Sequence, residues 1–213
     1  AMNALSCQVR SMLDEESAHL DQLRRDAQHD ALTGLLNREH FMQKAQHVLA
    51  DEKTDPTGAL FILRMPDLVR LNHELGREAT DALLKRVADA LKASCPDEVC
   101  HIGRLNGSDF AVLAPKMDSV DELAHRVVAD TRLSIKDPSM ALEHSVLLGA
   151  TAYRYGDAVS QVLSRADVAL GRAKQEGGIA VEMGDPDSEW KPVPSLASTW
   201  QVLIETALRQ KRV

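Results

Sequence analysis

The sequence predicts an α/β sandwich, in which helices flank a largely antiparallel sheet. From about residue 30, segments with helical hydrophobic periodicity alternate with short apolar runs of strand length. Two of these runs flank the turn-prone residues 106–109 (Asn-Gly-Ser-Asp), which is typical of a β-hairpin. Hydrophobic residues make up 44% of the chain and aromatic residues only 3%, so the core must be built mainly from aliphatic side chains.

The expected elements follow one another in the order helix, strand, helix, hairpin, helix, strand, helix. The expected helices span 38–50, 77–93, 119–133 and 158–175. The expected strands span 59–65, 99–105, 110–114 and 144–154. Helix 77–93 has the clearest pattern, because its alanine, leucine and valine residues recur on one side. Gly177 and Gly178 are expected to end the last helix.

Residues 1–28 are predicted to form an N-terminal helix. Their apolar residues are spaced alternately three and four apart, as in a heptad repeat, with Glu16 at one core position. Two interpretations remain open: an amphipathic helix that packs on its own domain, and a parallel coiled coil that joins two copies. The narrow apolar stripe favours the coiled coil, and therefore a homodimer.

The other end of the chain changes composition. Residues 184–198 are rich in proline, aspartate and serine, which is typical of a linker. Residues 199–213 then begin a new helix, which indicates the start of a truncated second domain. No apolar run approaches the roughly 20 residues that a membrane-spanning helix needs.

Charge and cysteine content limit the function classes. The formal net charge is -7 and no Lys/Arg-rich run is present, which argues against tight binding to a nucleic-acid duplex. Three cysteines without a C-x-x-C pair favour a reducing compartment and structural thiols. Cys95, Cys100 and His101 lie close in sequence, and a short loop contact is favoured there over a zinc site.

Four segments, in order, resemble the motifs of GGDEF domains, the diguanylate cyclase family. They are Asp30-Ala31-Leu32-Thr33-Gly34-Leu35-Leu36-Asn37-Arg38, the trio Asn72, Gly76 and Asp81, the stretch Arg104–Phe110, and Ala166-Asp167-Val168-Ala169-Leu170 with Ala173-Lys174. Together they cover about 150 residues. The resemblance implies a nucleotidyl-cyclase-like sandwich with a five-stranded, largely antiparallel sheet.

The resemblance also implies a chemistry. Active members condense two GTP molecules into cyclic di-GMP, by attack of a ribose 3′-hydroxyl on an α-phosphate. Two divalent metals stabilise the charge on the attacking and leaving oxygens, so the site needs convergent carboxylates. In the family these come from an Asp at the end of the first strand and from the acidic pair of the signature hairpin.

This sequence departs from the family at each of those positions. The strand position holds Arg64, and a guanidinium cannot ligate a cation. Asp67 lies at an odd offset along the expected strand and is therefore not expected to replace the missing carboxylate. The degenerate signature loop consists of Asn106, Gly107, Ser108, Asp109 and Phe110. We therefore expect no catalytic residue and no metal ligand, and an ion pair between Arg64 and Asp109.

Three residues match family positions that contact the nucleotide. Asn72 and Asp81 occupy positions that bind guanine in the family, and Lys174 occupies a position that contacts phosphate in the family. The resemblance therefore allows GTP as a bound ligand without Mg²⁺. A purely structural interpretation remains open: Asn72 caps a turn, Asp81 caps the following helix, and Lys174 is a solvated helix end.

The layout as a whole resembles tandem GGDEF–EAL proteins of the LapD type. It implies a degenerate GGDEF domain over 29–183, with 199–213 as the first helix of an EAL domain. It further implies the cytoplasmic part of a bacterial inner-membrane-anchored protein with an upstream sensor. The expected function is a non-catalytic relay and dimerisation module. A GTP-binding regulator of the EAL domain is the alternative, and an active cyclase ranks last.

Overall fold

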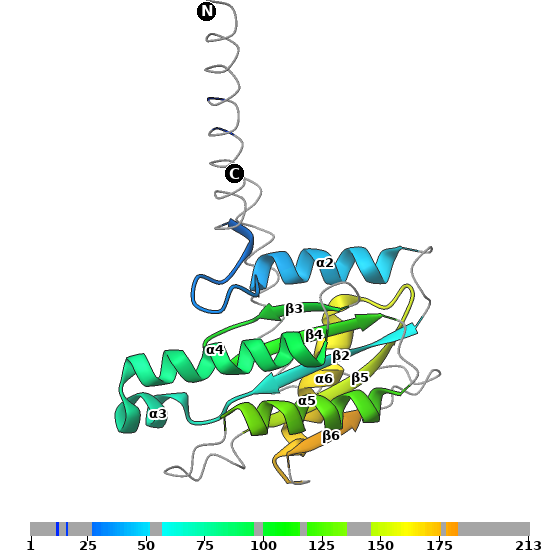
Figure 1. Cartoon of the computed structure of the whole chain (residues 1–213). Helices are drawn as coiled ribbons and strands as arrows, with labels where there is room; N and C mark the ends of the chain where they lie inside the picture. The colour runs from blue at the N-terminus through cyan, green and yellow to red at the C-terminus, as the bar shows by residue number, and fades with distance from the viewer. Residues whose placement is uncertain are drawn as a thin grey trace, which may run out of the picture.

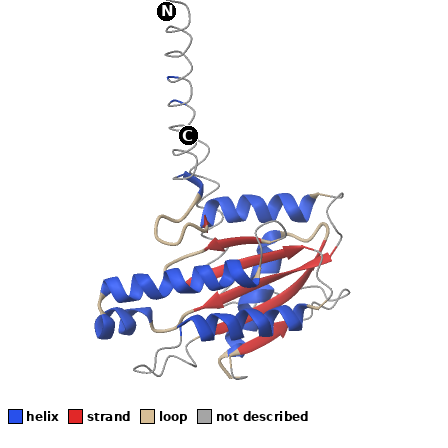
Figure 2. Ribbon diagram, viewed as in Figure 1, coloured by secondary structure: helices blue, strands red, loops and turns tan. Residues whose placement is uncertain are grey.

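The structure is a computed structural model, and it describes residues 12, 16, 27–51, 57–95, 100–115, 119–135, 146–175 and 178–182. Within these ranges, helices and strands build one α/β sandwich (Figures 1 and 2). The helices are α2 (Arg38–Ala50), α3 (Leu68–Leu75), α4 (Arg77–Ser94), α5 (Val120–Ile135) and α6 (Val159–Ala173). The strands are β1 (Leu36–Asn37), β2 (Thr57–Arg64), β3 (His101–Arg104), β4 (Asp109–Pro115), β5 (Leu147–Arg154) and β6 (Ile179–Glu182).

The strands form a six-stranded sheet in the order β1-β3-β4-β2-β5-β6. Strand β2 lies in the middle and pairs antiparallel with both β4 and β5. Strands β3 and β4 form the antiparallel hairpin, and the short edge strands β1 and β6 pair parallel with β3 and β5. The hairpin therefore lies directly beside the central strand, and its turn reaches the end of β2.

Strand β2 contributes to two hydrophobic layers, because successive side chains of a strand point to opposite faces. Phe61 and Leu63 belong to the layer that packs against α4 and α5. Leu60 and Ile62 belong to the layer under α2 and α6. Figure 1 shows α4 and α5 on the near face of the sheet, with α6 behind it. All four β2 side chains are buried, so the strand that ends in Arg64 is held from both sides.

Helix α6 approaches the sheet closely at Gly149 of β5. A Cβ atom at this position would collide with the backbone of Ala166 and Leu170. The missing side chain therefore lets the helix lie directly on the strand. This contact fixes the height of α6 above the end of β2, which determines where Asp167 of α6 lies.

The predicted α/β sandwich is confirmed, and every helix and strand expected between residues 38 and 175 is present to within a few residues at its described ends. Three elements were missed, namely β1, α3 and β6. With β1 and β6 added to the four strands expected from the pattern, the sheet has six strands among the described residues, where the family resemblance implied five. Gly76 separates α3 from α4 with a φ of 81°, a backbone conformation that favours glycine.

Several predictions for the two ends of the chain lie outside the described residues. In the range 1–28 the structure describes only Met12, Glu16, Ala27 and Gln28, all helical, which does not test the coiled coil. The linker 184–198 and the helix 199–213 are not described. None of the helices in the described ranges is both long enough and apolar enough to span a bilayer.

Candidate functional site

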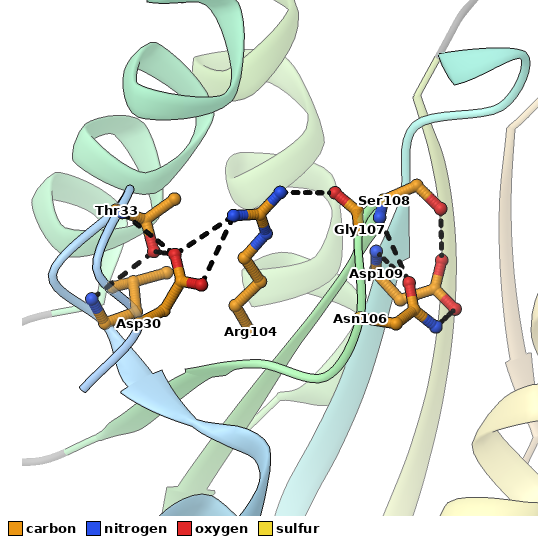
Figure 3. Close-up of polar contacts among 8 residues, drawn as sticks. Asp30, Thr33, Arg104, Asn106, Gly107, Ser108 and Asp109 are labelled. Atoms are coloured by element: carbon orange, nitrogen blue, oxygen red, sulfur yellow. Dashed lines mark hydrogen bonds and ion pairs between the residues drawn. The ribbon is translucent and has the colours of Figure 1, made fainter. Parts of the chain in front are cut away.

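The turn of the β3–β4 hairpin is organised by the side chain of Asn106. Its Oδ1 accepts hydrogen bonds from the backbone N–H groups of Ser108 and Asp109, both at 3.0 Å (Figure 3). The Nδ2 of Asn106 donates to Oδ2 of Asp109 at 2.8 Å. The Ser108 hydroxyl donates to the other carboxylate oxygen of Asp109, Oδ1, at 3.1 Å. Asn106 thus fixes the geometry of the turn through hydrogen bonds of its own side chain, whereas a glycine at this position would leave the turn conformationally free.

Asp109 and Arg64 form a bidentate ion pair. The two residues lie opposite each other in the β2–β4 ladder. Arg64 Nε donates to Oδ1 and Nη2 donates to Oδ2, each at 2.7 Å. The pairing expected from the sequence is therefore confirmed. A second carboxylate, Asp167 of α6, lies 3.7 Å from Arg64 Nη2, so one guanidinium faces carboxylates from two further elements.

The ion pair is held in its charged form. Burial alone would raise the pKa of Asp109, but hydrogen bonds from Arg64, Asn106 and Ser108 outweigh it and hold this pKa below its usual range. The hydrogen bond to Asp109 raises the pKa of Arg64, against the opposing effect of burial. The side chains of Asp109 and Asp167 are 3% and 5% exposed, and that of Arg64 is 38% exposed. Solvent therefore reaches the cation but not the anions.

A second ion pair ties the hairpin to the start of the domain. Arg104 Nη1 donates to Asp30 at 3.0 and 3.3 Å, while Nη2 donates to the carbonyl of Gly107 at 2.7 Å (Figure 3). Asp30 also accepts from the N–H and hydroxyl of Thr33. Despite burial, these bonds from Thr33 and Arg104 lower the pKa of Asp30. Arg104 therefore connects residue 30 directly to the signature turn.

The three expected nucleotide contacts lie on or directly beside three different helices. Asn72 is exposed on α3, Asp81 is half-buried on α4, and Lys174 is exposed directly after α6. Asp81 is the fifth residue of α4, whose N-cap is Gly76, so the expectation that Asp81 caps this helix is wrong. The remaining signature residue, Phe110, is fully buried in the core.

The orientation of Asp67 has a different cause from the one expected. Strand β2 ends at Arg64, so the alternation of strand side chains no longer applies at residue 67. Asp67 adopts a left-handed conformation with φ 59° at the start of α3. Its exposed carboxylate lies 4.0 Å from Arg70 Nε, so it faces its own helix.

Asp167 is the residue that sequence reasoning missed. It is a carboxylate on the buried side of α6, next to Ala166 and Leu170. A charged residue among buried apolar positions requires a partner, which is a signal that the sequence did contain. The partner, Arg64, lies about a hundred positions earlier in the sequence, and only the packing of α6 on the sheet reveals it.

The arrangement does not fit the divalent metals that the family resemblance implies. A two-metal centre needs several convergent carboxylates around open space. Here the converging carboxylates, Asp109 and Asp167, face the guanidinium of Arg64, which already supplies the positive charge. Within the described ranges, no three His, Cys, Asp or Glu residues are grouped so that they could hold a metal ion.

The sandwich, with its hairpin beside the central strand, has the architecture of a GGDEF-like domain. A family model described as "Diguanylate cyclase, GGDEF domain" matches residues 27–179. The chain therefore belongs to the GGDEF domain family of cyclic di-GMP signalling. Diguanylate cyclase DgcP of Pseudomonas aeruginosa is 30% identical over 191 residues, which cover 85% of this chain and 28% of that protein. Diguanylate cyclase DgcM of Escherichia coli is 26% identical over 180 residues, or 80% of this chain and 42% of that protein.

Solved structures share the fold. The S helix-GGDEF-EAL structure of Vibrio cholerae LapD bound to c-di-GMP has a TM-score of 0.72 and 22% identity, and covers 93% of this chain and 46% of its own. The structure of the coiled coil and GGDEF domain of Caulobacter crescentus DgcB, in complex with c-di-GMP, has a TM-score of 0.70 and 23% identity. The match covers 86% of this chain and 99% of that chain. At these identities the likeness concerns the fold alone. The chain spans less than half the length of the two curated relatives above.

Proposed function

We propose that this chain is a non-catalytic GGDEF domain that relays a conformational signal in cyclic di-GMP signalling. The observation that carries the proposal is the bidentate pairing of Arg64 with Asp109. Phosphoryl transfer by two metals needs anionic ligands that are open to the cations. In this chain the acidic residue of the signature hairpin is committed to an arginine, and the strand carboxylate is absent.

The second ion pair supports the relay. Residues 1–28 are the predicted input helix, and Asn37 Nδ2 donates to the carbonyl of Ala27 at 2.7 Å, which ties the end of that segment to the start of α2. Three residues later, Asp30 binds Arg104, which in turn binds Gly107 of the signature turn. A displacement of residues 27–30 therefore has a short, charged path to the hairpin and, through Asp109, to β2.

The domain layout of similar structures supports the outer parts of the proposal. In LapD of Vibrio cholerae an S helix, a GGDEF domain and an EAL domain follow one another. We infer the same order here, with residues 1–28 as a dimerising helix and residues 199–213 as the start of an EAL domain. In this arrangement the chain is the cytoplasmic part of a protein that an upstream sensor anchors to the inner membrane.

A second candidate function is GTP binding without catalysis, which regulates the adjoining EAL domain. The half-buried position of Asp81 inside α4 favours it, because this carboxylate does not serve as a helix cap. A carboxylate and an amide on neighbouring helices, Asp81 and Asn72, match the hydrogen-bond donors of a guanine edge. Lys174 supplies the positive charge that a phosphate needs.

One titration separates these functions. GTP is titrated calorimetrically into the 213-residue chain with Mg²⁺ present, and the cell contents are then chromatographed for cyclic di-GMP. No saturable heat and no product is the result expected of a relay. Saturable heat without product supports the regulator instead, and product would refute both proposals.

Two variants make the titration specific. If GTP binds, Asp81→Ala should abolish the heat, whereas Asp89→Ala on the same helix should leave it unchanged. The triple variant Arg64→Asp, Ser108→Asp and Asp109→Glu restores the family's acidic residues. If only this variant gives Mg²⁺-dependent heat, then Arg64 and the altered turn are what prevent GTP from binding with Mg²⁺ in the native chain.

A further inference from the structure

The signature turn contains the pair Asn106-Gly107, and both residues are exposed. Asn106 is the only asparagine of the chain that a glycine follows. In such a pair the backbone nitrogen of the glycine can attack the side-chain amide of the asparagine, because the glycine carries no side chain that hinders the approach. Spontaneous loss of a side-chain amide is therefore chemically easiest at this position of the chain.

We propose that Asn106 is a deamidation site, at which the closed hairpin turn holds the reaction back and an opened turn permits it. The side-chain amide must rotate before the Gly107 nitrogen can reach its Cγ. In the closed turn, Oδ1 of Asn106 accepts from the N–H groups of Ser108 and Asp109, each at 3.0 Å, and Nδ2 donates to Asp109 at 2.8 Å (Figure 3). Both ends of the amide are thus held in place. This inference does not depend on the proposed relay.

The residue that supplies the attacking nitrogen is held as well. The carbonyl of Gly107 accepts from Nη2 of Arg104 at 2.7 Å, and Arg104 is itself bound to Asp30. The closed turn also offers no acid to the departing ammonia. Despite burial, hydrogen bonds from its neighbours hold the pKa of Asp109 below its usual range, so this carboxylate has no proton to give. The contacts that order the turn therefore also slow the reaction.

The reaction needs only water as a co-reactant. The Gly107 nitrogen loses its proton to solvent and forms a bond to Cγ of Asn106, while the bond from Cγ to Nδ2 breaks and Nδ2 takes up a proton and leaves as ammonia. The result is a succinimide ring. Water then opens the ring at the side-chain carbonyl, which gives aspartate, or at the backbone carbonyl, which gives isoaspartate. The net change is the gain of one water and the loss of one ammonia, and no atom is oxidised or reduced.

Either product is incompatible with the native turn. In aspartate, a carboxylate oxygen takes the place of Nδ2, which lies 2.8 Å from Oδ2 of Asp109. Asp109 is anionic and 2% exposed, so two like charges would meet where little solvent screens them. In isoaspartate, the backbone runs through the former side chain, which displaces the N–H groups of Ser108 and Asp109 from their acceptor. A transient opening of the turn would thus be recorded as a permanent change in the hairpin.

Peptide mapping tests the proposal on the 213-residue chain. The chain is incubated for several days at pH 8 in water labelled with heavy oxygen, either in buffer or unfolded in guanidinium chloride. Trypsin then releases residues 105–116, which contain Asn106, and residues 71–77, which contain the exposed Asn72 as an internal control. A peptide deamidated during the incubation exchanges an amino group for a labelled hydroxyl and elutes in two forms, aspartate and isoaspartate.

In the unfolded chain, Asn106 should react and Asn72 should react far more slowly. In the folded chain, Asn106 should react at least about tenfold more slowly than in the unfolded chain, because several hydrogen bonds must break first. A folded chain that reacts as fast as the unfolded one, or faster, would overturn the role of the turn. An unfolded chain in which Asn106 is no more reactive than Asn72 would overturn the site itself.

The matched control is Gly107→Ala. The added Cβ would lie 3.5 Å from Leu68, an ordinary contact, and it would hinder the attack by the backbone nitrogen. Deamidation of Asn106 in the unfolded variant should therefore be far slower than in the unfolded native chain, and an equal rate would contradict attack by the Gly107 nitrogen. Because this control is measured in the unfolded chain, it stays decisive even if Gly107→Ala does not fold.

Discussion

Replacing Arg64 with methionine tests the central ion pair. The change keeps an unbranched apolar stem but removes the guanidinium, and it leaves two carboxylates, Asp109 and Asp167, at 3% and 5% exposure, without their shared cation. Removing one partner of a fully buried pair costs about 3–5 kcal/mol, whereas exposed pairs are worth about 0–1 kcal/mol. Because the Arg64 side chain is 38% exposed and partly screened by solvent, we expect a loss of about 2–3 kcal/mol at pH 7.

The pH dependence of this loss follows from the pKa shifts. In the native chain the pKa of Asp109 lies below its unfolded value, so the pair's contribution is present above about pH 4 and is lost as pH falls through the folded pKa. In Arg64→Met, burial dominates and raises this pKa above the unfolded value. The carboxylate then becomes neutral on mild acidification, so the destabilisation should shrink as pH falls below neutral.

The assay is urea unfolding followed by circular dichroism at pH 7 and at pH 5. The difference in unfolding free energy between the native chain and Arg64→Met should be clearly smaller at pH 5. Arg70→Met is the matched control, because Arg70 and its partner Glu74 are both about half exposed, and it should cost under about 1 kcal/mol at either pH. A loss for Arg64→Met that is as small as the control's, or equal at both pH values, would refute the reasoning.

Three further predictions concern the relay path, the helix contact and the input helix. Asp30→Ala should destabilise the domain by about 1–3 kcal/mol in urea unfolding, because it leaves Arg104 without its charged partner. Gly149→Ala should lower the unfolding free energy by about 2 kcal/mol, because the added Cβ collides with α6. Gly171→Ala adds a Cβ that meets no atom within 4 Å, and it should raise the unfolding free energy by about 0.5–1 kcal/mol. Leu20→Glu should convert a dimer to a monomer in light scattering, and an unchanged mass would contradict the coiled coil.

The long elements could be predicted from the sequence because their periodicity extends over several turns. Helix α4 repeats its apolar side for eighteen residues and was identified almost to its ends. Helix α3 was missed because it has only eight residues and directly follows Pro66-Asp67, which reads as a turn. Strands β1 and β6 have two and four residues and, unlike the equally short β3, neither flanks the hairpin turn that marked that strand.

The site was predictable where strand register decides the contact. Arg64 and Asp109 lie on paired strands, and the family motifs fix which residues face each other. Asp167 could not be placed in this way. Its contact with Arg64 depends on how α6 packs on the sheet, which does not follow from the local pattern.

An arginine differs from a metal ion in what it lets a site do. A bound metal keeps coordination positions that a substrate oxygen can enter, and it can leave or exchange. The Arg64 guanidinium is always charged, is tethered to β2, and directs Nε and Nη2 at Asp109. The hairpin is therefore fixed to the central strand whatever the cation concentration. Because Arg104 holds the same hairpin to Asp30, a movement at the start of the domain would be transmitted to the sheet without any ligand, which is the property that the proposed relay requires.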